Sequence, residues 1–261
     1  MKKYHIEEDC IWAVDETGFQ PGTGLKQRVI GPAKRKMQYQ QRDGNRENIT
    51  VMVTICADGN TIAPTVIYKG QAFSTNWHQD DSLNASIAHS KKGWTDGVIG
   101  RLWIEDFDKK TSTKANGRAR LLLVDGHNSH YTKDFLDYAR DHNIHVLCYP
   151  AHSTHVYQGL DVVVFGPLKR RWTEERDNFE NSKRLCITKQ NFISIYGQAH
   201  RKVLTPELVR MAFKKTGVWP LNPDVITKEM MATSLETSSQ GNLPLCQPSP
   251  VRAVSSMMHQ Y

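Results

Sequence analysis

The stretch RLLLVDGHNSH, residues 120–130, places an uninterrupted run of apolar residues directly before a carboxylate, Asp125. Such a run is typical of a strand that is buried on both faces of a sheet. The sequence IWAVD, residues 11–15, repeats the design and ends in Asp15. If the two strands pair in parallel, their carboxylates lie about 5 Å apart, the usual spacing of neighbouring strands. Because two carboxylates this close repel each other unless a cation lies between them, the pattern indicates a metal site.

A third aspartate, Asp161, follows an apolar, uncharged stretch and precedes a segment whose apolar residues fall on one helical face. Pro167 lies inside this helical pattern, where a proline cannot sit unperturbed. The helix is therefore either kinked at Pro167, or it begins near Gly166 with Asp161 on the turn before it.

The same kinds of pattern predict the other elements. Strands are expected over residues 11–14, 49–56, 64–68, 121–124 and 144–149, and helices from Thr95 to Phe107, from Thr132, from Asp161 or Gly166, and from Thr205 to Gly217. The residues expected to cap helices are Thr95, Thr132 and Thr205. Residues 69–92 are polar and predict an irregular connection. The order of elements is that of an RNase H-like α/β domain, in which three acidic residues meet at one end of the sheet. We therefore expect a mixed five-stranded sheet flanked by helices, with a helical C-terminal extension.

Changes in composition along the chain predict where the domain begins and ends. A short lead-in of residues 1–10 precedes the catalytic domain, which we place at residues 11–180. Residues 181–233 form the helical extension that closes this domain. From residue 234 to residue 261 the sequence turns to Ser, Gln, Pro and Met without periodicity, which predicts a disordered tail.

The bulk properties indicate an intracellular protein with a polyanionic partner. The 261 residues carry a formal charge of +7, and the five cysteines are odd in number and scattered. No apolar run approaches the roughly 18–20 residues that span a bilayer, and no secretory signal is visible. Seven basic residues and one acidic residue lie between Lys26 and Arg46. This segment is equally well explained as a nuclear-localisation tract, a DNA-contacting loop or a solvated connection, and we expect a nuclear location.

Three carboxylates without a zinc-type cluster suit hard cations that prefer oxygen ligands, so we expect two Mg²⁺ or Mn²⁺ ions held by Asp15, Asp125 and Asp161. Two such ions can activate an attacking hydroxyl and stabilise a leaving oxygen on a phosphodiester. Any single aspartate after a strand is equally well explained as a cap or a turn. Basic residues in the flanking segments are expected to hold the DNA backbone, namely Lys109, Lys110, Lys114, Arg118, Lys169, Arg170 and Arg171.

The histidines form two H-x-x-H pairs, His127 with His130 and His152 with His155. Zinc sites with this spacing usually also contain cysteine or a helical H-E-x-x-H, and neither is present. We expect His127, His130 and His155 instead to hydrogen-bond phosphates or to orient the aspartates. Glu16 is left out of the ligand set, because it points to the opposite face if the strand continues.

Several motifs in order resemble the DDE superfamily endonucleases, the catalytic domains of mariner/pogo-type transposases, and most closely pogo-like elements of fungi. The matching stretches are VDETGF (14–19), GWT (93–95) with FDK (107–109), LLVDGHNSH (122–130), PAHSTH (150–155), QGLD (158–161) with FGPLK (165–169), and FKKTGVWPLNP (213–223). The resemblance covers roughly residues 11–224 and implies that Asp15, Asp125 and Asp161 are the catalytic, metal-binding triad. Gly159 stands where the family pattern usually has proline, and Val163 where it usually has glycine.

The resemblance implies a metal-dependent catalytic core that cuts and joins DNA phosphodiesters. The alternative is a non-catalytic DNA- or chromatin-binding relative of such a transposase. Transposases of this type carry helix-turn-helix modules upstream, and only ten residues precede the first predicted strand, so we expect a fragment or a copy without that half. The expected partner is DNA, bound as a possible homodimer, with no membrane and no small-molecule cofactor.

Overall fold

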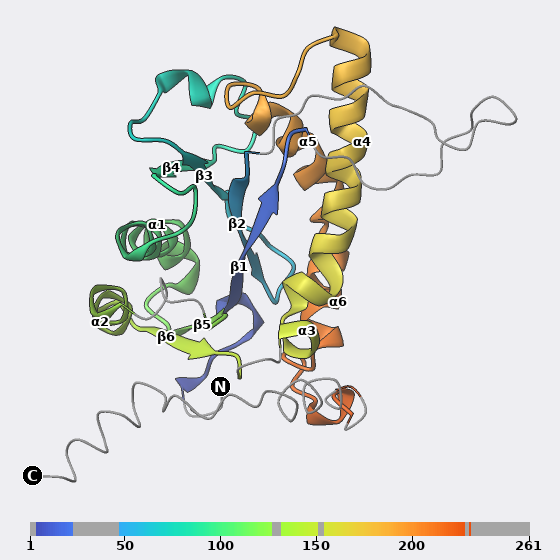
Figure 1. Ribbon diagram of the computed structural model, residues 1–261. Helices are drawn as coiled ribbons and strands as arrows, with labels where there is room; N and C mark the ends of the chain where they lie inside the picture. The colour runs from blue at the N-terminus through green and yellow to red at the C-terminus, as the bar shows by residue number, and fades with distance from the viewer. Residues whose placement is uncertain (1–3, 23–46, 127–131, 151–153, 228–229, 231–261) are drawn as a thin grey trace, which may run out of the picture. The chain divides into compact units, whose positions relative to one another are not determined.

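The computed structural model describes residues 4–22, 47–126, 132–150, 154–227 and 230. By contact, residues 1–226 form one unit and residues 227–261 a second. The first unit contains a six-stranded sheet in the order β4-β3-β2-β1-β5-β6, which Figure 1 shows at the centre of the fold. The strands are β1 (Ile11–Phe19), β2 (Ile49–Cys56), β3 (Thr65–Lys69), β4 (Ser86–Ser90), β5 (Arg120–Val124) and β6 (Ile144–Cys148).

The sheet confirms the RNase H-like α/β architecture and corrects the number of strands. Strands β1, β2 and β3 are antiparallel neighbours, and β1, β5 and β6 are parallel neighbours. This is the mixed arrangement that the sequence predicts, with one more strand at its edge. Strand β4 pairs in parallel with β3, although its sequence SIAHS lies in the stretch expected to be irregular. All five of its residues are half-buried, so it lacks the apolar alternation that would have revealed it.

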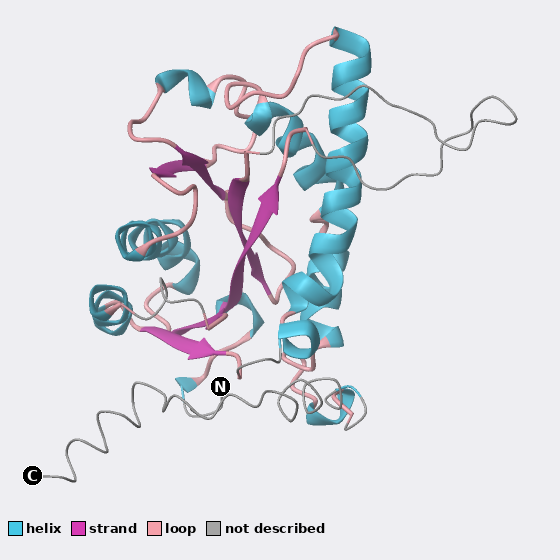
Figure 2. Ribbon diagram, in the orientation of Figure 1, coloured by secondary structure: helices cyan, strands magenta, loops and turns pink. Residues whose placement is uncertain are grey.

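Two layers of helix cover the two faces of the sheet (Figure 2). The helices of the domain are η2 (Glu8–Cys10), η3 (Thr75–His78), α1 (Gly97–Ala115), α2 (Lys133–Asp141), α3 (Thr154–Tyr157), η5 (Leu160–Val164), α4 (Phe165–Lys183), α5 (Phe192–Val203), α6 (Pro206–Lys215) and η6 (Pro223–Val225). Apolar side chains of α1 and α2 share one core with Trp12 and Val14 of β1. Those of η5, α4, α5 and α6 share the other with Ala13 and Phe19. The face of β1 on which a residue lies therefore decides which helices it meets.

Strand β1 is longer than predicted, which changes the setting of Asp15. The expected strand ended at Val14, but β1 continues to Phe19 because β2 pairs with it along its whole length. Asp15 pairs with Val53 and lies in the middle of the strand. On the other side, β5 pairs only with Ile11, Trp12 and Ala13. Asp15 is thus internal to the β1–β2 hairpin and lies beyond the last residue of β1 that pairs with β5.

Two of the three predicted helix caps are confirmed. The hydroxyl of Thr132 accepts a hydrogen bond from the backbone N–H of Phe135, and that of Thr205 accepts one from Leu208. Helix α1 instead begins after Asp96, whose carboxylate accepts the N–H of Ile99, so the prediction of Thr95 was wrong by one residue. Aspartate and threonine both serve as caps, which is why adjacent candidates are hard to separate from sequence.

The structure shows where the helix that contains Pro167 begins. Helical conformation begins at Leu160 and runs without a break through Pro167 to Lys183. Its first five residues form the wider π turn η5, and Asp161 lies in that turn rather than before the helix. A proline removes one backbone donor and crowds the carbonyl four residues earlier, which is Val163 here. The wider π geometry of η5 contains that carbonyl, which accounts for a continuous helix at this position.

No helix in the described part of the chain is long and apolar enough to cross a membrane. Four cysteines lie in that part, and all are free thiols. The expected tail, and the basic segment between Lys26 and Arg46, lie outside the described residues.

Candidate active site

Asp15 and Asp125 are brought level by the pairing of β1 with β5. Ala13 pairs with Leu123, and the same register continued by two residues aligns Asp15 with Asp125, the residue that follows β5. Ala13 and Leu123 both belong to the core beneath α4, α5 and α6. Because strand side chains alternate between faces, Asp15 points to that same side, and the alternation carried one residue past β5 directs Asp125 there as well.

Asp161 is supplied by the helical layer that covers this face. It lies on η5, which packs against α6 and contacts β1. Leu160, Val163 and Val164 of the same turn are buried, whereas Asp161 is exposed. The apolar residues anchor the turn in the core beneath α4, while the aspartate remains exposed.

The electrostatics show that the three carboxylates act on one another. Burial raises the pKa of Asp15 well above its ordinary range, and the negative charges of Asp161 and Asp125 raise it further. The pKa of Asp161 is also raised, by desolvation and by Asp125, against the lowering effect of Lys169. The backbone N–H of Glu16, which donates to Asp15 Oδ1 at 2.7 Å, favours the charged form of Asp15 and acts against these effects. The folded protein therefore concentrates negative charge at this point.

This charge is of the kind that divalent cations neutralise. In the described residues, no three His, Cys, Asp or Glu side chains stand close enough together, as they are oriented, to hold an ion. The donor chemistry of the site nevertheless fits Mg²⁺ or Mn²⁺, since three aspartates offer hard oxygen ligands. A cation between them would remove the repulsion that raises the pKa of Asp15.

Tyr149 belongs to the same site and was missed in the sequence. It directly follows β6, and its backbone N–H donates to the carbonyl of Val124 at 3.0 Å, next to Asp125. Its ring packs against the core beneath α4. Burial raises the pKa of its phenol, and the charges of Asp15 and Asp161 raise it further. The apolar run before Pro150 predicted a strand here, but only the pairing of β6 with β5 shows what the tyrosine faces.

The predicted DNA-contacting residues divide into two groups. Lys169, Arg170 and Arg171 follow Asp161 on the next turns of the same helix, and Lys169 is close enough to lower its pKa. Lys169 and Arg170 are exposed, and Arg171 forms an ion pair with Glu174 at 2.7 Å. These residues adjoin the carboxylates.

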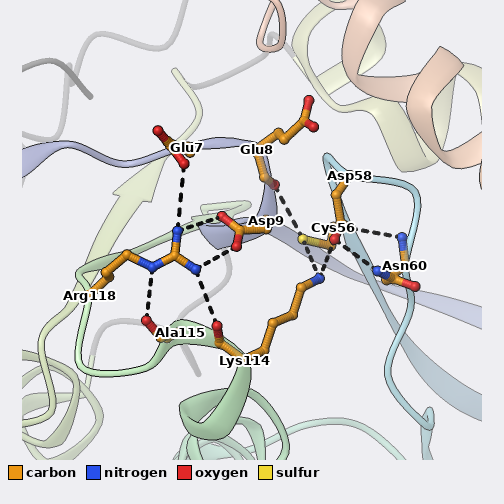
Figure 3. Close-up of polar contacts among 9 residues, drawn as sticks. All are labelled: Glu7, Glu8, Asp9, Cys56, Asp58, Asn60, Lys114, Ala115 and Arg118. Atoms are coloured by element: carbon orange, nitrogen blue, oxygen red, sulfur yellow. Dashed lines mark hydrogen bonds and ion pairs between the residues drawn. The ribbon is translucent and has the colours of Figure 1, made fainter.

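The other group lies at the C-terminal end of α1 and is already engaged in contacts within the protein. Lys114 pairs with Asp58 at 2.5 Å, and Arg118 pairs with Asp9 at 2.5 Å, as Figure 3 shows. Lys110 pairs with Asp106 at 2.6 Å. Lys109 is exposed.

The position of these contacts also separates them from the carboxylates. Asp9 precedes β1 and Arg118 precedes β5, so this network joins the edge of the sheet at which the two strands begin. Asp15 and Asp125 lie farther along the same strands, toward the opposite edge. Lys114 and Arg118 are therefore engaged in ion pairs, and they lie near the start of the strands and not near the aspartates.

Of the predicted histidines, His155 is exposed on α3, the short helix just before η5. His127, His130 and His152 lie outside the described residues. Glu16 follows Asp15 within β1, and the alternation of the strand turns it toward the other face, as predicted.

The family of the chain is established by comparison with known proteins. The family model described as DDE superfamily endonuclease matches residues 46–213, which is well over half of the chain. The chain belongs to the DDE superfamily endonucleases. The matched range contains Asp125 and Asp161 and begins after Asp15.

A curated relative extends the similarity beyond that range. The protein named MFS-type transporter clz9, from Cochliobolus lunatus, is 34% identical over 230 residues, which make up 87% of this chain and 25% of the relative. The DDE chain thus spans about a quarter of the length of that relative.

Solved structures of Mos1 transposase are similar in fold at low sequence identity. The Mos1 mariner paired-end complex with Mn is 11% identical, with a TM-score of 0.48 over 84% of this chain and 57% of that one. The isolated catalytic domain of Mos1 mariner transposase is also 11% identical, with a TM-score of 0.41 over 80% of this chain and 83% of that one.

Proposed function

We propose that this domain is a metal-dependent DNA endonuclease of the transposase type, which cuts and joins phosphodiesters. The observation that carries the proposal is the convergence of Asp15, Asp125 and Asp161 on one face of the sheet, where burial and mutual repulsion raise the pKa of Asp15. A structural role alone does not explain an aspartate that is only 7% exposed beside two others. Membership of the DDE superfamily endonucleases supports the same conclusion.

Asp15, Asp125 and Asp161 would hold two Mg²⁺ or Mn²⁺ ions. Ions bound there would lower the pKa of an attacking water or hydroxyl and stabilise the leaving 3′ oxygen. The N–H of Glu16 holds one oxygen of Asp15 in place, and the strand pairing with Val53 fixes the backbone around it. The buried apolar residues of η5 hold Asp161 from the other side. The fold thus fixes the backbone that carries Asp15 and Asp161.

The DNA backbone would run past the start of α4. Lys169 and Arg170 lie exposed there on the helix that carries Asp161, and cations at this position would hold phosphates on either side of the reacting one. Lys110, Lys114, Arg118 and Arg171 are left out of the proposed DNA surface, because carboxylates within the protein neutralise their charges. We place the activity in the nucleus, where an enzyme of this kind meets its substrate.

Calorimetric titration of the purified protein with Mn²⁺ tests the site directly. Wild type should bind the ion and Asp125→Asn should lose that binding, because one of three carboxylate ligands is gone. Asp137→Asn is the matched control, since this partly exposed carboxylate pairs with Arg140 on α2, the layer on the opposite face of the sheet from Asp161. Equal Mn²⁺ binding by the two variants would remove Asp125 from the ligand set.

A further inference from the structure

An open hollow lies at the edge of the sheet where β3 and β4 end. It has a volume of about 660 Å³ and is lined by Glu47, Lys69, Gly70, Gln71, Lys91 and Lys189. Lys69 is the last residue of β3, and Lys91 follows β4 directly. Glu47 stands just before β2 and Lys189 just before α5. Four separate segments of the chain therefore meet around this hollow.

The walls of the hollow are held in place by backbone contacts. The N–H of Gly70 donates to the carbonyl of Ser90 at 2.9 Å, which ties the end of β3 to the end of β4. Gly93 has φ +75° and its backbone lies so close to Lys69 that an added Cβ would come within 3.1 Å of the lysine Cβ. The hydroxyl of Thr50 donates to the carbonyl of Gly93 at 2.8 Å. These contacts fix the base of both lysine side chains while leaving their amines exposed.

The charge of the hollow is positive. Lys189 is neutralised by Glu47 at 2.7 Å and donates to the carbonyl of Lys69 at 2.5 Å, so it acts as part of the wall. Lys69 and Lys91 are exposed, and neither has a carboxylate partner among the described residues. Two uncompensated ammonium groups at the mouth of a hollow make a site for an anion.

The hollow lies at the end of the sheet toward which Asp15 is also placed along β1. Strands β1, β3 and β4 run in the same direction, so their ends share one edge of the sheet. Asp15 lies four residues before the end of β1 and two strands away from β3. The pairing of β1 with β2 and of β2 with β3 places Lys69 five residues beyond the level of Asp15. At about 3.3 Å per residue and 4.8 Å per strand, the separation is on the order of 20 Å. That is roughly the length of six base steps at 3.4 Å each.

We propose that this hollow is a second DNA contact, in which Lys69 and Lys91 bind a backbone phosphate about six base steps from the one at the aspartates. The inference rests on the proposed function for its choice of DNA as the anion. Lysine binds phosphate as a point charge, so the contact positions the duplex without reading its sequence.

The test is the salt dependence of DNA affinity, measured by fluorescence anisotropy on a labelled duplex, with Asp125→Asn as the background so that no cleavage occurs. The Lys69→Gln/Lys91→Gln variant should lower the slope of log K against log salt by about 0.9, since it removes one phosphate contact. The control Lys133→Gln/Arg140→Gln removes the same charge from two exposed positions on α2, and its slope should match the background. The Lys69→Arg/Lys91→Arg variant keeps both charges and should keep the slope.

Three outcomes would overturn the proposal. They are an unchanged slope in Lys69→Gln/Lys91→Gln, an equal fall in the control, and a background protein that does not bind DNA. Plasmid nicking by wild type in Mn²⁺ reports separately on the proposed function. If wild type nicks the plasmid but the Lys69→Gln/Lys91→Gln variant keeps the salt slope, only the DNA contact at the hollow is rejected. If the slope falls but wild type does not nick, the DNA contact stands and the endonuclease activity is rejected.

Discussion

Gly159 packs directly against the backbone of Ala212 on α6. A Cβ built at Gly159 would lie 2.8 Å from the carbonyl oxygen of Ala212 and 3.1 Å from its Cβ. Gly159 has ordinary helical angles, so it is the space and not the conformation that excludes a side chain. Gly159 is therefore a point of close contact with α6, two residues before Asp161. Helix α6 and the carboxylate are linked through it.

Replacing Gly159 by alanine should destabilise the domain by about 1–3 kcal/mol, the usual cost of overpacking. The matched control is Gly166→Ala in the first turn of α4, where an added Cβ meets nothing within 4 Å. That change should be neutral or stabilising by up to about 1 kcal/mol, because alanine favours a helix over glycine. Urea denaturation of both variants measures the difference. Equal stabilities would show that α6 can move away from the added Cβ without loss of stability.

Removing the charge of Asp15 should stabilise the metal-free protein at neutral pH. Burial first, and then Asp161 and Asp125, raise the folded-state pKa of Asp15 above its unfolded value of about 3.9. Between these two values the folded state binds more protons than the unfolded state, so stability falls as the pH rises. The contribution is fully present below pH about 4 and is lost as the pH rises through the folded pKa.

In the presence of a chelator, Asp15→Asn should therefore raise the melting temperature at pH 7 and have little effect near pH 4. Thermal melts of wild type and variant at the two pH values check this. A variant that is less stable than wild type at pH 7 would mean that the carboxylate of Asp15 has a stabilising partner in the protein.

Lys114 is predicted to hold the fold and not the DNA. It pairs with Asp58 at 2.5 Å and its amine lies 4.9 Å from the centre of the Trp12 ring. Lys114→Met keeps the apolar packing and removes the ion pair, so we expect a loss of about 1 kcal/mol in stability and no change in the salt dependence of DNA binding.

The comparison variant for Lys114 is Lys169→Gln on α4, next to the carboxylates. It should leave stability unchanged and lower the salt slope of DNA binding by about 0.9. If Lys114→Met lowered the salt slope of DNA binding and Lys169→Gln did not, α1 would instead belong to the DNA-binding surface.

The positions of Asp15 and Asp125 in the fold were accessible to sequence reasoning because each follows a run of residues with an unambiguous burial pattern. Leu121 to Val124 are buried on both sides, as an apolar run before Asp125 predicts. The register that aligns Asp15 with Asp125 is a consequence of two such strands lying side by side. The end of β1 was missed, since Asp15 is buried by its neighbours and does not terminate the strand.

What sequence reasoning did not show depends on partners that are distant along the chain. Lys114 has the same local appearance as Lys169, and only the fold brings Asp58 to one and Asp161 to the other. Tyr149 was placed on a strand, but its nearness to Asp15 depends on β6 lying beside β5. Local patterns predict elements and their faces, whereas charge compensation is decided by packing between them.

The central claim is that the three aspartates form a working metal site, and nicking of supercoiled plasmid in Mn²⁺ tests it most directly. Wild type should convert supercoiled DNA to nicked circles, and Asp125→Asn should not, while both bind the plasmid equally. Binding without nicking by either protein would contradict the claim and favour a DNA-binding relative that has lost catalysis.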